Sequence, residues 1–361
     1  MFLFRYAASV GYIGSAGALT VALDTIRESH ILDGYDFNFI IRYDNCVEKN
    51  AVADAIDMVM NYNADAFIGP TCNAPAIATG VISSVYNLPH YVWGFTTANE
   101  LANAPRFPTV IIMTPNYFSL ALLSVMGHFG WTEFAFIYSG AEDAERCPVY
   151  LTDLQKAVFD QPSFTLSFNA MWRNNTDQDM NLILSELKDK ARIVVLCSSS
   201  AAIKRKLLLL AHDLDMTTDE YVYILSDLGA SGYIGGTSSK TNQTAYVWED
   251  QSTPADGRDK DAYSVFKRTL ALSDVADDSH TSAAYTEFAD RVQQKMRLPP
   301  FLCSSECDKA NGWKIALFAN QLHDAFLMYA TVANRTLTAG HSYRDGTYMF
   351  NHTAGVYQGY F

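Results

Sequence analysis

Short apolar runs alternate with segments of helical periodicity along most of the chain. Leu19, Leu23 and Ile26 recur at three- and four-residue spacing, which predicts a helix over residues 15–29. The apolar run at 66–68 ends in a glycine–proline pair, a turn signal, and predicts a strand. Strands that alternate with helices in this way are typical of a parallel sheet with helices on both faces.

The same alternation extends over the chain and predicts two lobes. It places strands at 2–6, 37–43, 66–68, 89–95, 108–113, 134–138, 163–170, 192–197 and 221–225. It places helices at 15–29, 51–62, 74–86, 117–129, 150–159, 178–189, 201–214, 281–296 and 311–334. The Gly/Ser/Thr-rich stretch at 235–261 is expected to be a crossing or surface loop.

We therefore predict an α/β protein with two doubly wound, parallel-sheet lobes, because these units exceed what one small domain requires. Residues 1–113 form the first part of lobe 1 and residues 114–235 the first part of lobe 2. Residues 236–338 return to lobe 1, and residues 339–361 return to lobe 2. The apolar start of the chain is shorter than the roughly 7–15 residues of a secretory core, so an extracellular protein would begin upstream of Met1.

The net charge of the chain disfavours two classes of binding function. The chain has 26 Lys and Arg against 39 Asp and Glu, a net charge of −13, which disfavours binding to nucleic acid or to anionic lipid. Its longest apolar runs fall short of the roughly 18 residues of a membrane-spanning helix. Any attachment to a membrane would need a segment absent from this chain.

Catalytic signatures are absent from the sequence, and we expect no enzyme, metal or cofactor. There is no Gly-x-Ser-x-Gly elbow, no P-loop and no His-Glu-x-x-His, and the eight histidines are scattered. Two glycine triplets leave an NAD(P)-dependent enzyme as the least favoured alternative: Gly11, Gly14 and Gly17, and Gly229, Gly232 and Gly235.

Six cysteines are compatible either with three disulfides in an oxidising compartment or with six buried thiols. Several of them follow predicted strands, whose ends lie close together in a parallel sheet. This spacing favours the pairs Cys46–Cys72, Cys147–Cys197 and Cys303–Cys307. Four glycosylation sequons lie outside predicted core strands, at Asn174, Asn242, Asn334 and Asn351.

Several blocks resemble the extracellular ligand-binding domain of receptor guanylyl cyclases, above all the large nematode branch. They are Leu32-Asp33-Gly34-Tyr35-Asp36-Phe37, Tyr43-Asp44-Asn45-Cys46 and the run from Ile68-Gly69-Pro70-Thr71-Cys72 to Ala78. The resemblance covers nearly the whole chain. It implies a type I periplasmic-binding-protein fold, with two lobes, three crossings and a ligand cleft between the lobes. It also implies the first two disulfide pairs.

The resemblance further implies an ectodomain that controls an intracellular cyclase through one membrane helix, neither of which is in this chain. The protein would be a homodimer on the outer side of the plasma membrane, and its ligand a peptide, an ion or a small molecule. Because the family's second lobe continues beyond Phe361, we expect a fragment or a truncated gene model. A soluble solute-binding or decoy protein of the same fold is the alternative.

Candidate binding residues follow from relatives of this fold that sense amino acids. Asn73 and Thr97 match polar positions after strands of lobe 1, and Asp227 and Asp143 are the candidates in lobe 2. Asn73 and Thr97 could equally cap the helices that follow them. Natriuretic-type members hold chloride with a serine hydroxyl where this chain has Phe39, so a chloride site is not expected.

Overall fold

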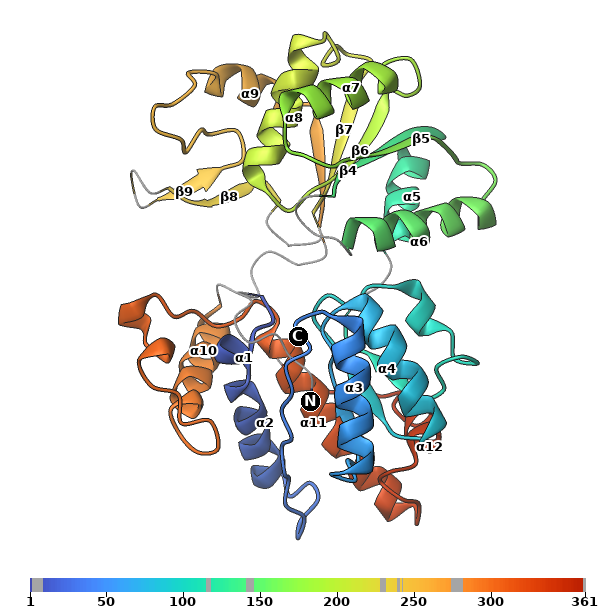
Figure 1. The fold of residues 1–361 in the computed structure, drawn as a ribbon, viewed down its shortest axis with the longest axis vertical. Helices are drawn as coiled ribbons and strands as arrows, with labels where there is room; N and C mark the ends of the chain where they lie inside the picture. Colours follow the sequence, from blue (N-terminus) through green and yellow to red (C-terminus); the bar gives the residue numbers. More distant parts are fainter. Residues whose placement is uncertain are drawn as a thin grey trace. The chain divides into compact units, whose positions relative to one another are not determined.

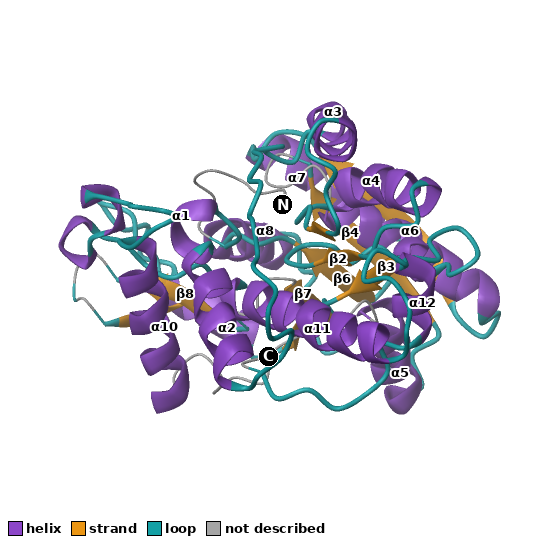
Figure 2. Ribbon diagram, turned by 90° about the horizontal axis from the view of Figure 1, so that it is seen from below, coloured by secondary structure: helices purple, strands orange, loops and turns teal. Residues whose placement is uncertain are grey.

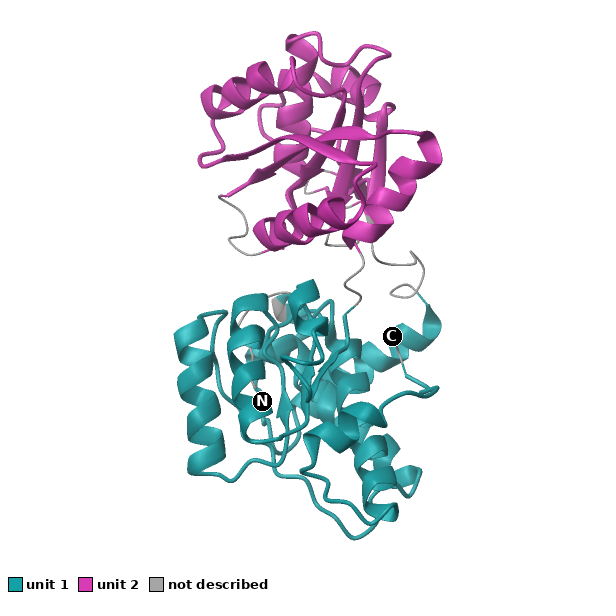
Figure 3. Ribbon diagram, turned by 90° about the vertical axis from the view of Figure 1, so that its right-hand side faces the viewer, with its two compact units in different colours: residues 1–116, 278–361 teal, residues 117–277 magenta. Residues whose placement is uncertain are grey.

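The computed structural model describes residues 1, 9–114, 118–140, 146–227, 232–238, 241, 243–273 and 282–359. The chain divides into two compact units, which Figure 3 shows in different colours. Unit 1 comprises residues 1–116 and 278–361, and unit 2 comprises residues 117–277. Both units are α/β with parallel strands, as the sequence pattern predicts.

Unit 1 contains the parallel strands β1 (Phe67–Ile68), β2 (His90–Val92) and β3 (Val110–Ile112), in that order. Helices α2 (Gly17–Glu28) and α11 (Ala319–Thr338) lie on one side of these strands, and α3 (Glu48–Met60) and α4 (Asn73–Val85) on the other (Figure 2). The core between them includes Leu19, Tyr91, Trp93 and Phe326, all fully buried.

Shorter elements and one further long helix complete unit 1. They are α1 (Tyr12–Ser15), η1 (Asn99–Ala102), α10 (Ala283–Met296), η2 (Ser305–Cys307), η3 (Lys309–Asn311) and α12 (Gly346–Asn351).

Unit 2 is built on a parallel sheet with strand order β10-β7-β6-β4-β5. The strands are β4 (Glu133–Ser139), β5 (Thr165–Trp172), β6 (Ile193–Cys197), β7 (Val222–Asp227) and β10 (Thr269–Ser273). Two pairs of helices cover its opposite faces: α5 (Phe118–Phe129) with α6 (Arg146–Asp160), and α7 (Asp177–Leu187) with α8 (Ala201–Asp213) (Figure 1). The antiparallel hairpin β8 (Ile234–Thr237) and β9 (Thr244–Tyr246) precedes α9 (Asp259–Phe266).

Apart from residues 114–116, which belong to unit 1, the predicted boundaries of the lobes need correction at two places. Residues 236–277, which were assigned to lobe 1, belong to unit 2, because β10 pairs in parallel with β7 over five residues. Residues 339–361, which were assigned to lobe 2, belong to unit 1. There Met349 of α12 is fully buried in the same core as Phe326.

Three predicted elements also differ from the structure. Residues 37–43 form no strand with described residues; the Met1 amino group donates to the Ile40 carbonyl at 2.7 Å, and the Arg42 amide donates to the Met1 carbonyl at 2.9 Å. The stretch 235–261, expected to be a loop, contains most of the β8–β9 hairpin and the start of α9. The long helix predicted from residue 311 begins at Ala319. The strand predicted at 2–6 lies outside the described residues.

The first glycine triplet serves helix packing. A Cβ atom on Gly17 would lie 2.3 Å from the carbonyl oxygen of Val292 in α10, and one on Gly14 would lie 2.8 Å from the amide nitrogen of Ala316. These glycines therefore let backbones of the same chain approach each other closely. Gly229 of the second triplet lies outside the described residues.

The structure contains the three cysteine pairs that the spacing favours: Cys46–Cys72, Cys147–Cys197 and Cys303–Cys307. Their Cα atoms are 5.6, 5.9 and 6.0 Å apart, within the usual range for disulfides. Among the described residues, no helix combines the length and the apolar character that crossing a bilayer requires.

Candidate functional site

The turn after β1 prepares a polar region at the carboxyl end of the unit 1 sheet. β1 ends at Ile68 and is followed by Gly69, whose φ of +80° suits glycine; Pro70, Thr71 and Cys72 then lead directly into α4. His90 of β2 lies beneath this turn, and its Nε2 is 2.7 Å from the Gly69 carbonyl oxygen. Burial lowers the pKa of His90 to about 4, so the neutral imidazole donates this hydrogen bond.

A second loop, residues 93–98 after β2, closes over the start of α4. The amide of Phe95 donates to the Thr71 carbonyl at 2.8 Å, and the amide of Ala98 donates to Asn73 Oδ1 at 2.9 Å. From α11, Gln321 Oε1 accepts the amide of Gly94 at 2.8 Å. The turn before α4, α4 itself and α11 therefore hold this loop in place.

Three buried polar atoms at this place make no hydrogen bond with any described residue: Thr71 Oγ1, Asn73 Nδ2 and Thr96 Oγ1. All three side chains are at most 1% exposed. A buried polar group that stays unsatisfied costs about 1–3 kcal/mol, so each of these three atoms has hydrogen-bonding capacity that no described residue uses. We call these three residues the polar cluster of unit 1.

The polar cluster has a definite chemistry. Two hydroxyls can donate or accept, and the amide nitrogen of Asn73 donates. The amino end of α4, a helix of 13 residues, adds the positive end of its dipole. The arrangement suits an oxygen-rich or anionic group of a ligand. It contains no side chain placed as a nucleophile or a general base.

The structure brings together the two candidate residues of unit 1. Asn73 belongs to the polar cluster, and its Oδ1 fixes Ala98, the residue that follows Thr97. Neither residue acts as a helix cap in the expected way: Cys72 is the N-cap of α4, Ala98 is the N-cap of η1, and neither helix has a capping side-chain bond. The half-buried Thr97 hydroxyl bonds to no other described residue.

Of the two candidate residues of the second lobe, the structure describes only Asp227. Asp227 is the last residue of β7 and pairs in register with Ser273 of β10, which puts its backbone at the carboxyl end of the unit 2 sheet. Asp143 lies outside the described residues. Whether these residues share one ligand with Asn73 and Thr97 stays a prediction.

Two residues of this region, Thr96 and Gln321, are not among those predicted from the sequence. Thr96 directly precedes the predicted residue Thr97. Two consecutive threonines after a predicted strand could therefore have indicated it. Gln321 lies in α11, far along the chain from the loop it fixes, and it is fully buried. No local pattern marks such a contact.

A cavity of about 280 Å³ in unit 1 contains none of the candidate residues. Its walls come from the extended segment 35–40, from residues 62–66 before β1 and from α11. Phe39, which the resemblance to natriuretic-type members places where they have a chloride-binding serine, lines this cavity and packs edge-to-face on Phe326 at 5.3 Å. It brings no hydroxyl to an anion site.

The remaining site predictions concern metals and glycans. Among the described residues, no group of three His, Cys, Asp or Glu side chains is placed to hold a metal ion. Asn174 and Asn351 are exposed, and Asn334 is half-buried within α11. Asn242 lies outside the described residues.

Comparison with known proteins identifies the family. Residues 14–357 match the model described as the receptor family ligand binding region. Receptor-type guanylate cyclase gcy-13 of Caenorhabditis elegans is 34% identical over 92% of this chain and 32% of its own length. For gcy-7 of the same organism the identity is 31%, over 94% of this chain and 31% of the relative.

A third relative, gcy-20 of Caenorhabditis elegans, is 30% identical over 97% of this chain and 32% of its own length. The chain thus spans about a third of the length of these relatives. The family match covers both compact units, including the turn before α4 and the polar cluster. The chain belongs to the receptor family ligand binding region.

Proposed function

We propose that this chain is the extracellular ligand-binding domain of a receptor guanylyl cyclase, and that it controls a cyclase domain outside this chain. The family match over residues 14–357 carries the proposal, together with the names of the relatives. Three disulfides fit an oxidising, extracellular compartment. A full-length transcript tests this assignment, which requires a membrane-spanning segment and a cyclase domain in the same reading frame.

The alternative is a soluble binding protein of the same fold. It predicts a transcript that encodes no apolar segment of about 20 residues. That result would remove the receptor assignment and would leave the ligand-binding role intact.

Ligand binding at the polar cluster is the second part of the proposal, and Thr71→Val and Thr96→Val test it. Each change removes a buried hydroxyl that bonds to no described residue and keeps the shape of the side chain. Without ligand, both variants should therefore unfold at or slightly above the temperature of the wild type. With a ligand found by screening, the stabilisation measured for the wild type should shrink.

Thr79→Val is the matched control, because Thr79 is also fully buried in α4 but its hydroxyl donates to the Pro75 carbonyl at 2.8 Å. This variant should lose some stability and keep the full ligand-induced shift. Asp227→Asn and Thr97→Ala extend the test to the remaining candidates. If the two valine variants keep the full shift, the ligand does not bind at the polar cluster.

The receptor assignment also predicts a homodimer, and the outer faces of α3 and α4 support this. Ile56 and Met60 are one turn apart on α3, and Val81 and Val85 are one turn apart on α4; all four are exposed, Met60 by 66% and Val85 by 74%. The hydroxyl of Tyr86 lies 3.8 Å from Met60 Sδ, which joins the two helices into one apolar face.

Met60→Asp tests this dimer by sedimentation velocity. A carboxylate buried in an apolar interface would lose its hydration without gaining a partner, so the variant should sediment as a monomer at concentrations where the wild type is a dimer. Leu182→Asp on α7, 63% exposed in unit 2, is the control and should leave the dimer unchanged. A wild type that is monomeric at all concentrations would reject the homodimer.

A further inference from the structure

Unit 2 carries an exposed aromatic face. Tyr246 of β9 and Trp248 stack with ring centroids 4.7 Å apart and an interplanar angle of 4°. Trp248 also contacts Tyr263 of α9, at 5.3 Å between centroids. Ile234 of β8 lies opposite Tyr246 in the hairpin register. Ile234, Tyr246 and Tyr263 are exposed, and with Trp248 they form what we call the aromatic face.

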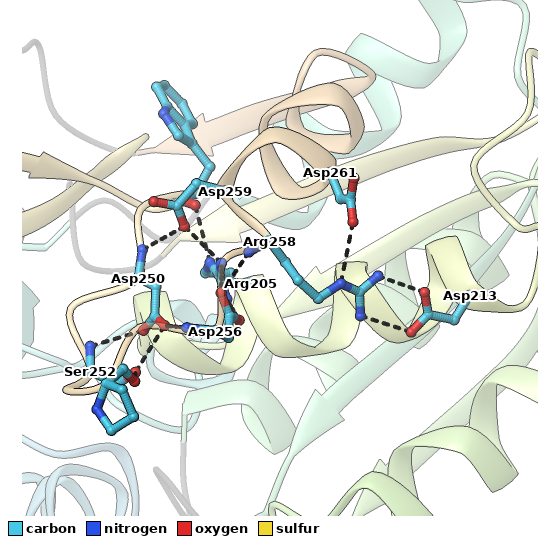
Figure 4. A network of polar contacts seen from close by, with 10 residues as sticks. Arg205, Asp213, Asp250, Ser252, Asp256, Arg258, Asp259 and Asp261 are labelled. Atoms are coloured by element: carbon cyan, nitrogen blue, oxygen red, sulfur yellow. Dashed lines mark hydrogen bonds and ion pairs between the residues drawn. The ribbon is translucent and has the colours of Figure 1, made fainter.

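The segment that carries Trp248 is held in place from beneath by Arg205 of α8 (Figure 4). The Arg205 guanidinium donates to the Trp248 carbonyl at 3.0 Å, to Asp256 Oδ1 at 2.8 Å and to Asp259 Oδ1 at 2.8 Å. The amide of Asp250 donates to the same Asp259 oxygen at 2.9 Å. These contacts order the segment from Trp248 to the start of α9. The segment therefore loses less conformational entropy when a partner binds.

A second arginine fixes α9 to the end of α8. Arg258 donates two parallel hydrogen bonds to Asp213, at 2.9 and 2.6 Å, and a third to Asp261 at 3.3 Å (Figure 4). Paired bonds of this kind fix orientation as well as distance. Because Arg258 fixes the start of α9 in this way, it also fixes the position of Tyr263, two residues beyond Asp261.

These ion pairs present more carboxylate than guanidinium to solvent. The Arg205 side chain is only 9% exposed, whereas its partners Asp256 and Asp259 are 38% and 52% exposed. Residues 249–261 contain five acidic and two basic side chains. Backbone amides and Ser252 lower the pKa of Asp250 to about 2, so it stays ionised. The surface of this segment is negative.

The negative segment adjoins the aromatic face directly. Glu249 Oε2 accepts the amide of Tyr246 at 3.1 Å. Asp259 lies one helical turn before Tyr263 on α9, so the two share a side of the helix. The Lys267 ammonium lies 4.7 Å from the centroid of the Tyr263 ring, so this ring already makes one cation–π contact within the chain.

We propose that the aromatic face and the adjoining carboxylates form a docking site for a cationic peptide segment, in which arginine or lysine side chains alternate with apolar ones. Rigid aromatic side chains supply the apolar contact, and the carboxylates select positive charge and repel anionic partners. The proposal concerns unit 2 alone and holds with or without the receptor assignment.

The test uses the full chain and a fluorescein-labelled octapeptide of alternating arginine and leucine, with fluorescence anisotropy as the readout. The same peptide with citrulline in place of arginine is the matched probe, since it keeps the shape and loses the charge. We expect the arginine peptide to bind at least tenfold more tightly than the citrulline peptide. Its affinity should fall as salt rises from 50 to 300 mM.

Tyr246→Ser and Tyr263→Ser should each weaken binding of the arginine peptide at least fivefold. Phe159→Ser is the control, because Phe159 of α6 is 84% exposed on the same unit but lies outside the aromatic face. If a tyrosine variant fails to fold, Glu249→Gln decides, since glutamine keeps an acceptor for the Tyr246 amide and loses the charge. Equal affinities for the two peptides, or unchanged affinity in the variants, would overturn the proposal.

Discussion

Acid should destabilise unit 1 through one buried imidazole, that of His90. His90 begins β2 and is fully buried, with Nε2 2.7 Å from the Gly69 carbonyl oxygen and Nδ1 3.1 Å from Ser83 Oγ. Because a carbonyl oxygen only accepts, Nε2 carries the hydrogen, and Nδ1 accepts from the serine hydroxyl. A second proton would have to displace that hydroxyl hydrogen and would place a charge in the core.

The size of the effect follows from the pKa of His90. Burial lowers this pKa to about 4, from an ordinary value of 6.5 that also applies to the unfolded chain. As the pH falls, the unfolded chain binds the proton first, so the contribution of His90 to stability is complete above pH 6.5 and is lost towards pH 4. The free energy of unfolding should fall by about 2 kcal/mol at pH 5 and by about 3 kcal/mol at pH 4.

His90→Gln isolates this contribution, because the glutamine amide can still donate to Gly69 but does not titrate. We would measure the free energy of unfolding of both proteins in urea at pH 7.5 and 5.0. Pulsed hydrogen exchange in peptides from β2 and α4 would report unit 1 separately from unit 2. The loss of stability between the two pH values should be about 2 kcal/mol smaller in the variant than in the wild type.

Ser83→Ala is the control for a merely local disturbance. It removes the hydroxyl partner of Nδ1 and leaves the imidazole in place, so the variant should be less stable and should keep a strong dependence on pH. If His90→Gln and the wild type lose the same stability between pH 7.5 and 5.0, within 0.5 kcal/mol (a factor of roughly 2 in the equilibrium constant), the reasoning from burial is refuted.

Further predictions concern packing, disulfides and glycans. Gly17→Ala should lower the free energy of unfolding by about 1–3 kcal/mol, because its Cβ would meet the Val292 carbonyl; Gly127→Ala in α5, where the new Cβ has only an ordinary contact at 3.5 Å, should not. Cys72→Ala opens a disulfide with a separation of 26 residues and should cost about 3–4 kcal/mol, seen as reduced secretion. In secreted protein, glycosidase treatment in heavy-oxygen water should label the exposed Asn174 and not Asn334, whose Thr336 is 1% exposed.

The central strands of unit 2 could be predicted because burial on both faces leaves a direct trace in the sequence. β6 is buried at every position, and its residues form an unbroken apolar run that the pattern placed within one residue. β5, at the edge of the sheet, is mostly exposed or half-buried, and its predicted bounds are displaced by two residues at each end. A strand is most readable where both of its faces contact helices.

Elements held by distant polar contacts could not be predicted from local pattern. β8 has the sequence Ile-Gly-Gly-Thr, so only Ile234 and Thr237 favour a strand. All four of its positions are exposed. The segment after β9 has no apolar periodicity, and its order depends on Arg205, about 50 residues earlier in the chain. Composition therefore indicated a loop where ion pairs fix a definite structure.

The candidate site shows the same division between local and distant causes. Asn73 could be found because it follows a strand and a turn, and parallel strands bring such positions to one edge of a sheet. The hydroxyls of Thr71 and Thr96 are buried because loop 93–98 closes over α4. Gln321, from the other end of the chain, holds this loop in place. The residues that offer unused hydrogen-bonding capacity are thus defined by a contact between distant segments. A polar residue after a strand is a candidate in the sequence, and only closure of the loop leaves its polar atom buried with hydrogen-bonding capacity that no described residue uses.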